Sequence, residues 1–117
     1  MLMDLLPDHP GITWNVMWVW AITKSEYDYI ALEKKINESY TGLKISKKEM
    51  KCFLESVNQI IDLLILGDSK SENIKRYESD EEMFKKCSYV IEIIDGYFWE
   101  IHSSDFEFID NIKQRLN

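Results

Sequence analysis

Three residues near the C-terminus, Glu100, His102 and Asp105, are the ones best suited to acid–base chemistry. Residues two apart in an extended strand lie on one face, so the Glu100 carboxylate could orient the His102 imidazole as a general base. Ser103 and Ser104 have a sufficient role at the start of a helix, so neither is presented as a nucleophile. No second histidine stands at zinc-ligand spacing. We therefore expect a structural or surface role for His102, no catalytic or metal-binding residue, and no cofactor.

The other reactive residues also favour structural roles. His9 lies beside Asp8 in a segment with two prolines, where a surface histidine is the simplest interpretation. Cys52 and Cys87 stand in apolar stretches without a Cys-x-x-Cys spacing, which favours small buried thiols over a disulfide or a metal site. The glycines are scattered singly, so the phosphate-loop and dinucleotide fingerprints are absent.

The order of the charges is the most informative feature. The formal net charge is −7, and no lysine or arginine occurs between Lys86 and Lys113. This argues against nucleic acid or an anionic membrane as a partner, since both attract basic residues. The acids of this stretch form either a solvated face with helix-dipole complementarity or a docking surface for a basic protein. The second interpretation assigns partner binding to Glu92, Asp95, Tyr97, Trp99, Glu100, Asp105 and Glu107.

A β-hairpin predicted over Ser88–Ile101 carries most of these residues. Asp95-Gly96 joins its two apolar runs, and a two-residue Asp-Gly loop is typical of a type I′ turn with positive φ at both positions. This loop places Glu92 opposite Trp99. Both faces of the hairpin are then mostly apolar, so it must join a larger sheet that is covered on one side and partly on the other. The glutamates mark where the cover ends.

A long strand is predicted over Ile12–Ile22, whose residues alternate between two faces. Trp14, Trp18 and Trp20 share one face in this pattern. Large aromatic residues on one strand face usually form core, although they could also make a ligand platform.

Helix starts are indicated by Ser46 with Glu49, Ser79 with Glu82, and Ser104 with Glu107, and an earlier helix begins near Thr23 or Ser25 and ends at Gly42. The run Ile60–Leu66 either continues the helix from Ser46 or forms a buried strand. We favour the strand, because a three-stranded sheet would leave much of the tryptophan-rich surface uncovered.

The chain is thus predicted to form one α+β domain over residues 1–117. Helices pack on an antiparallel or mixed sheet of about four strands that includes the C-terminal hairpin. Residues 1–11 form an N-terminal arm, and residues 67–78 form a polar loop that we expect to be mobile. The N-terminus lacks the basic region of a signal peptide and no stretch suits a transmembrane helix, so we expect a cytoplasmic location.

This compact, acidic, aromatic-rich chain, with acids concentrated on a hairpin and a final helix, resembles the immunity proteins that bacteria pair with secreted or contact-delivered toxins. Those proteins commonly block a basic toxin, often a nuclease, by covering its active site with acidic side chains. The resemblance implies a non-enzymatic inhibitor whose acidic hairpin end, from Glu92 to Glu107, occupies a cationic cleft.

Two other functions remain open. Lysines cluster between residues 34 and 51, so the lysine-rich helices of one copy could contact the acidic end of another in a homodimer or scaffold. Alternatively, a small enzyme or ligand binder could use the face of Trp14, Trp18 and Trp20 with His102, which predicts a sizeable pocket lined by those residues.

Overall fold

The computed structural model describes residues 11–23, 29–96 and 98–116. Its elements are β1 (Thr13–Thr23), α1 (Tyr29–Glu38), β2 (Leu43–Lys44), α2 (Lys47–Ser56), β3 (Val57–Asp68), the 3-10 turn η2 (Ser71–Asn73), α3 (Asp80–Lys86), β4 (Tyr89–Ile94), β5 (Phe98–Ser103) and α4 (Phe106–Leu116). The predicted arm, except for residue 11, and the helix start at Ser25 lie outside the described residues.

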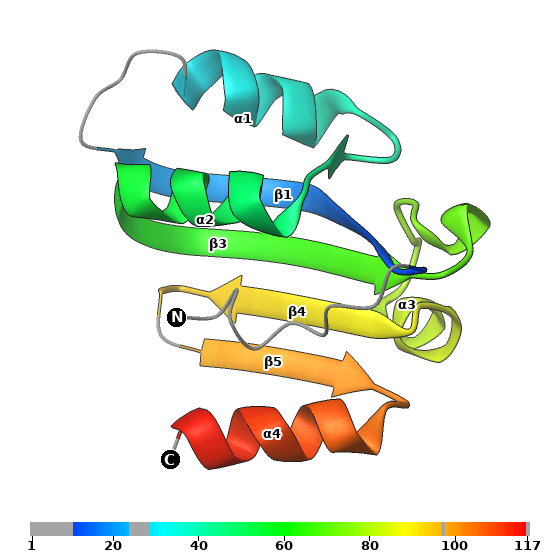
Figure 1. The fold of residues 1–117 in the computed structure, drawn as a ribbon. Coiled ribbons are helices and arrows are strands. Elements are labelled where there is room, and N and C mark those ends of the chain that lie inside the picture. The colour runs from blue at the N-terminus through cyan, green and yellow to red at the C-terminus, as the bar shows by residue number, and fades with distance from the viewer. Residues whose placement is uncertain (1–10, 24–28, 97, 117) are drawn as a thin grey trace.

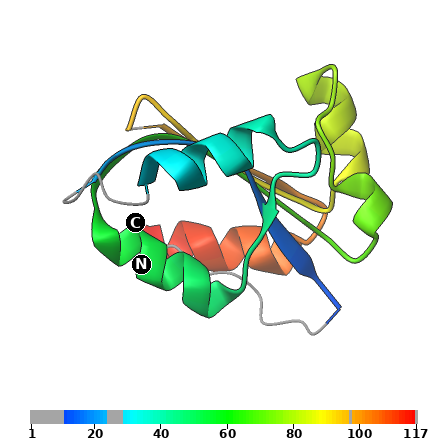
Figure 2. The ribbon, with the colours of Figure 1, turned by 90° about the horizontal axis from the view of Figure 1, so that it is seen from above.

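Five antiparallel strands form one sheet in the order β2-β1-β3-β4-β5 (Figure 1). Residues of α1, α2 and α4, among them Ile36, Met50 and Phe108, join the larger core cluster on one face. Figure 2 places α3 on the opposite side of the sheet from α2 and α4, where Met83 joins a second, smaller cluster. The α+β prediction is confirmed, with five strands instead of about four because β2 has only two residues.

The run Ile60–Leu66 is a strand, as we favoured. It belongs to β3, which starts directly after α2 and lies between β1 and β4. Leu63 and Ile65 join the helix-side core, whereas Leu66 joins the α3-side core. The C-terminal half of β3 is buried on both faces while its neighbours satisfy its backbone, and this explains the apolar run from Leu63 to Leu66.

A β-bulge in β1 overturns the expectation that its three tryptophans share a face. The register between β1 and β3 shifts between Val16 and Trp18, which leaves Met17 as an extra residue. Trp14 is buried in the helix-side core, whereas Trp18 and Trp20 lie on the other face and are exposed. One inserted residue reverses the alternation of the strand beyond it.

The C-terminal hairpin forms with a different loop from the one predicted. Asp95 and Gly96 adopt the expected positive φ angles, 54° and 75°. The pairing resumes at Phe98, opposite Ile94, so three residues separate the strands in place of two. Every residue of β5 is therefore displaced by one position from the predicted pairing.

This displacement decides where the acids of the hairpin lie. Glu100, and not Trp99, stands opposite Glu92. Ile101 packs against the helix-side core, on the face to which the predicted register had assigned Glu100. Burying an isoleucine instead of an ionised carboxylate favours the observed register.

Helix starts agree with the sequence at two of three places. Ser46 and Ser79 cap α2 and α3, each accepting a hydrogen bond from the backbone N–H three residues later. The prediction of Ser104 as the cap of α4 is wrong, because Asp105 accepts the hydrogen bond from the Phe108 N–H at 3.1 Å. Within the described ranges, no helix has the length and apolar character needed to cross a membrane.

Candidate functional site

Large apolar side chains are exposed on the part of the sheet that α3 leaves uncovered. On β1, Trp18, Trp20 and Ile22 are 44%, 51% and 49% exposed, and on β5 Phe98 is 66% exposed. Isolated exposed apolar residues are ordinary, but a group of them on one sheet face is typical of a binding surface. We call this surface the open face and define it as Trp18, Trp20, Ile22, Asp62, Leu64, Glu92, Phe98 and Glu100.

The charged residues of the open face as defined are all acids, and His102 lies next to them on β5, with its Nε2 3.9 Å from Glu100. One row of paired residues across four strands consists of Trp18, Leu64, Glu92 and Glu100. In the neighbouring row, Trp20 stands opposite Asp62. The strands β1, β3, β4 and β5 contain no lysine or arginine. The open face is therefore both aromatic and negatively charged.

Glu92 lies at the centre of this charge. Its pKa is raised above the ordinary value by burial, then by the carboxylates of Asp80 and Glu100, while His102 lowers it. Like charges and desolvation both disfavour the ionised form. The site thus holds a carboxylate in surroundings that favour the approach of a positive charge.

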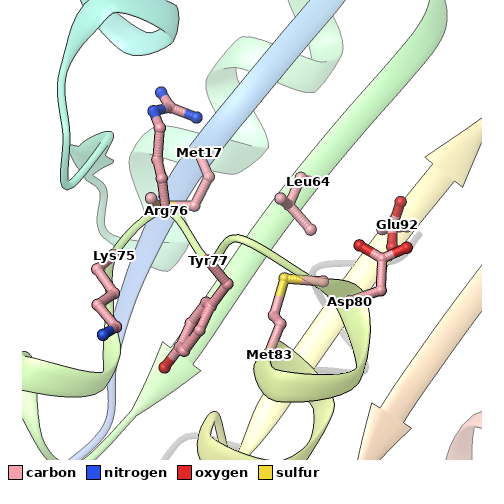
Figure 3. Close-up of a pocket in the computed structure, with 8 residues that line it drawn as sticks. All are labelled: Met17, Leu64, Lys75, Arg76, Tyr77, Asp80, Met83 and Glu92. Atoms are coloured by element: carbon pink, nitrogen blue, oxygen red, sulfur yellow. The ribbon is translucent and has the colours of Figure 1, made fainter.

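A hollow of about 220 Å³ lies between the open face and α3 (Figure 3). Its walls come from β1, β3, β4, α3 and the segment before α3, and they consist of Met17, Leu64, Lys75, Arg76, Tyr77, Asp80, Met83 and Glu92. Leu64 and Glu92 belong both to the hollow and to the open face. The two features therefore form one continuous surface.

Two charged residues, Asp68 and Arg76, fix the segment between β3 and α3, which forms one wall of the hollow. The buried Asp68 carboxylate accepts hydrogen bonds from the backbone N–H groups of Lys70 and Ser88, both at 2.8 Å, and from Asn73 Nδ2 at 3.3 Å. Burial raises the pKa of Asp68, but these hydrogen bonds outweigh it and the net pKa is lowered.

Arg76 holds the same segment to α1. Its guanidinium donates to the carbonyl oxygens of Ile36, Asn37 and Ser39, at 2.8, 3.2 and 3.0 Å. Ile74 of this segment is buried in the α3-side core. The loop that we predicted to be mobile therefore has defined anchors on both the sheet and α1.

The seven residues predicted to bind a partner are divided among different parts of the fold. Glu92 and Glu100 lie together on the open face, and Asp95 is exposed at the tip of the hairpin. Asp105 caps α4 and accepts a hydrogen bond from the Tyr89 hydroxyl at 2.8 Å.

Glu107 does not extend that pair. Glu107 is exposed in the first turn of α4, a helix that packs on the other side of the sheet. Tyr97 and the side chain of Trp99 lie outside the described residues. Among the predicted side chains that the structure describes, only Glu92 and Glu100 come together on the open face.

The predicted arrangement around His102 forms in part, since Glu100 lies beside it on β5. The His102 ring stacks on Phe84 at a centroid distance of 3.7 Å, and its Nε2 lies 3.9 Å from Glu100. The Asp105 carboxylate accepts hydrogen bonds from the Tyr89 hydroxyl and the Phe108 N–H. The expected pocket joining Trp14, Trp18 and Trp20 to His102 is also ruled out, because Trp14 faces the opposite side of the sheet.

Of the two cysteines that we predicted to be buried, one is buried and the other is exposed. Cys87 is buried, but the prediction that Cys52 is buried is wrong, since Cys52 is exposed on α2. Among the described residues, no three His, Cys, Asp or Glu side chains are grouped so as to hold a metal ion. His9 lies outside these residues.

The fold and site define an α+β protein with an exposed, acidic and aromatic sheet face. No protein-family model matches the chain, and neither a curated protein nor a solved structure shows significant similarity to it. The open face is therefore the feature from which we infer a function.

Sequence reasoning favoured a core position for Trp18 and Trp20, with a ligand platform as the alternative, and gave no surface role to Ile22 or Asp62. One signal was present, because Asp62 interrupts an otherwise apolar run between Ile60 and Leu66. An acid inside a buried strand indicates that one position faces solvent. The bulge at Met17, which turns the tryptophans outward, has no comparable local signal.

Proposed function

We propose that the protein is a non-enzymatic, cytoplasmic binding protein that inhibits a basic protein toxin by covering a cationic surface, in the manner of bacterial immunity proteins. The supporting observation is the open face, where Trp18, Trp20 and Phe98 are exposed beside acids on strands that carry no lysine or arginine. Aromatic residues supply the desolvated anchors of protein interfaces, and surface acids select a basic partner. The open face replaces the acidic hairpin end as the interface that we assign.

A second copy of the chain is a less suitable occupant of the open face. Across a twofold axis, the same patch meets itself, so Asp62, Glu92 and Glu100 of one copy would approach those of the other. Like charges in an interface oppose association. A basic partner instead offsets the repulsion among the carboxylates of this face.

A pull-down from the host, with the protein as bait at low and then raised salt, tests the function. We expect one basic protein, released by salt because the attraction between exposed charges is screened. Co-expression with this protein in a surrogate cell should suppress the toxicity of the captured partner. Recovery of no basic protein, or of one whose toxicity is unaffected, would reject the inhibitor function.

Matched charge reversals then locate the interface. Glu100→Lys should slow association with the captured protein about tenfold or more at low salt, whereas Glu107→Lys makes the same change on α4 and should have little effect. Trp20→Ser should mainly speed dissociation, since it removes a packed anchor. If Glu107→Lys has the larger effect, the interface lies at the acidic end and not on the open face.

A further inference from the structure

The walls of the hollow beside α3 differ in chemistry from one end to the other. Met17, Leu64 and Met83 provide apolar surface. At one end, the side chains of Asp80 and Glu92 lie beside each other (Figure 3). Asp80 is close enough to act on the charge of Glu92. The hollow therefore has an apolar floor and a doubly acidic end.

The two basic residues of the hollow do not neutralise this end. The guanidinium of Arg76 is engaged by three carbonyl oxygens at the end of α1. The Lys75 ammonium lies over the Tyr77 ring, 5.2 Å from its centroid. In Figure 3 both charged groups point away from Asp80 and Glu92.

We propose that this hollow receives one long aliphatic cation, the side chain of a lysine or an arginine on the basic partner. Its stem packs on Met17, Leu64 and Met83, and its charged end lies between the carboxylates of Asp80 and Glu92. Lysine and arginine combine such a stem with a charged head, and charge-assisted hydrogen bonds to carboxylates are among the strong ones. The inference rests on the proposed function, because it names the anchor residue that the same partner supplies.

The electrostatics of Glu92 are consistent with this occupant. Burial and then the carboxylates of Asp80 and Glu100 raise its pKa, whereas His102 lowers it. A cation between the two acids offsets both the repulsion and the desolvation. An anion or a neutral apolar group would offset neither.

The test uses NMR titrations of the whole protein with three small probes, so it does not require the partner. The probes are the N-acetyl, N′-methylamide derivatives of lysine, arginine and norleucine, the last of which has the stem without the charge. We expect lysine or arginine to shift the methyl signals of Leu64 and Met83 in a saturable manner at millimolar concentrations. Norleucine should bind at least about tenfold more weakly. Equal binding of norleucine, or no saturable shift with either cation, would overturn the proposal.

Variants distinguish cation binding in the hollow from a general attraction of cations to an acidic protein. Glu92→Gln and Asp80→Asn should each weaken cation binding about tenfold, while Glu81→Gln should not. Glu81 is a suitable control because it lies on α3 beside Asp80, pairs with Lys85 and has an 82% exposed side chain. An equal loss in Glu81→Gln would assign the binding to net charge instead of the hollow.

The two proposals fail separately. If the probes bind but no basic toxin is captured, the hollow is a cation site and the inhibitor function is rejected. If a toxin is captured but the probes do not bind, the inhibitor function stands on the open face alone and the hollow has no such role.

Discussion

At the scale of single residues, the pairing of Glu92 with Glu100 opposes the stability of the sheet. Two carboxylates stand directly opposite each other on adjacent strands, where like charges are destabilising. Positions that sacrifice stability in this way are expected at functional sites. Removing one of the two charges therefore tests whether the acids of the open face cost the protein stability, as expected for residues that serve binding.

Glu92→Gln should raise the free energy of unfolding at pH 7 by about 0.2 to 1 kcal/mol. The folded-state pKa of Glu92 is raised, so its ionisation weakens the fold as the pH rises through that pKa, and the gain from glutamine should vanish below about pH 4. Urea denaturation of the wild type and of Glu92→Gln measures the difference in the free energy of unfolding at pH 7 and at pH 4. A loss of stability at pH 7 would contradict the repulsion.

Asp68→Asn should destabilise the protein by about 2 to 3 kcal/mol, because the amide cannot accept from all three donors around a buried carboxylate. The folded-state pKa is lowered from its ordinary value of 3.8. The stabilisation of the fold by the ionised Asp68 carboxylate is therefore complete above about pH 4 and is lost as the pH falls through the lowered pKa.

Denaturation curves from pH 7 to pH 2 check this prediction, with Glu72→Gln as an exposed control in the same connection. The difference between the wild type and Asp68→Asn should shrink below about pH 4. A constant difference over the whole range would show that the charge of Asp68 is not responsible.

The two thiols should differ in reactivity. Cys52 is exposed, whereas Cys87 is buried and its pKa is raised to about 11, mainly by burial. Since the thiolate is the reactive form, a disulfide reagent at pH 8 should modify one thiol in the native protein and a second only after unfolding. Cys52→Ser should remove the fast reaction. Rapid modification of two native thiols would contradict the burial of Cys87.

At the scale of elements, Arg76 connects α1 to the segment that precedes α3. Its three hydrogen bonds reach carbonyl oxygens at the end of α1, which carry the negative end of the helix dipole. Asn37, in the last turn of α1, hydrogen-bonds the N–H and C=O of Val19. One helix end therefore couples the edge of β1 to the wall of the hollow.

Arg76→Ala should lower the free energy of unfolding by about 2 to 3 kcal/mol, since it leaves three carbonyl groups without their charged donor. Amide hydrogen exchange should also become faster at Val19. Lys75→Ala is the adjacent control and should cost about 1 kcal/mol or less, because it removes a cation–π contact with Tyr77 and a weak attraction to the partly exposed Glu82. Equal effects of the two variants would argue against the connection through α1.

At the scale of the whole molecule, the exposed apolar groups and the acids of the open face have opposite effects on self-association. Apolar groups favour pairing of two copies, while the acids oppose it. The protein should therefore be monomeric at low salt and associate weakly, if at all, at high salt, where repulsion is screened.

Sedimentation velocity at low and at about 0.5 M salt checks this prediction. Any association at high salt should disappear in Trp18→Ser with Trp20→Ser. A dimer that forms at low salt and dissociates when salt is added would instead support contact between the lysine-rich helices and the acidic end.

Local chemistry was sufficient to predict several elements. Ser46 and Ser79 begin helices because their side chains satisfy nearby backbone N–H groups, and these contacts lie within four residues. Asp95 and Gly96 adopt positive φ for an equally local reason. The strand character of β3 followed from the apolar composition of Ile60–Leu66. The second reason, that the tryptophans needed a wider sheet to cover them, did not hold, because Trp18 and Trp20 are exposed.

The sequence alone therefore determined the α+β class, the main strands, two helix caps and the acidic character of the chain. Only the tertiary structure decided which residues share a surface. The bulge at Met17 turns Trp18 and Trp20 outward, and the three-residue hairpin loop brings Glu100 beside Glu92. Both displacements amount to one residue, and in a strand one residue exchanges the two faces. Which face is buried depends on packing against distant elements, so no local pattern could specify it.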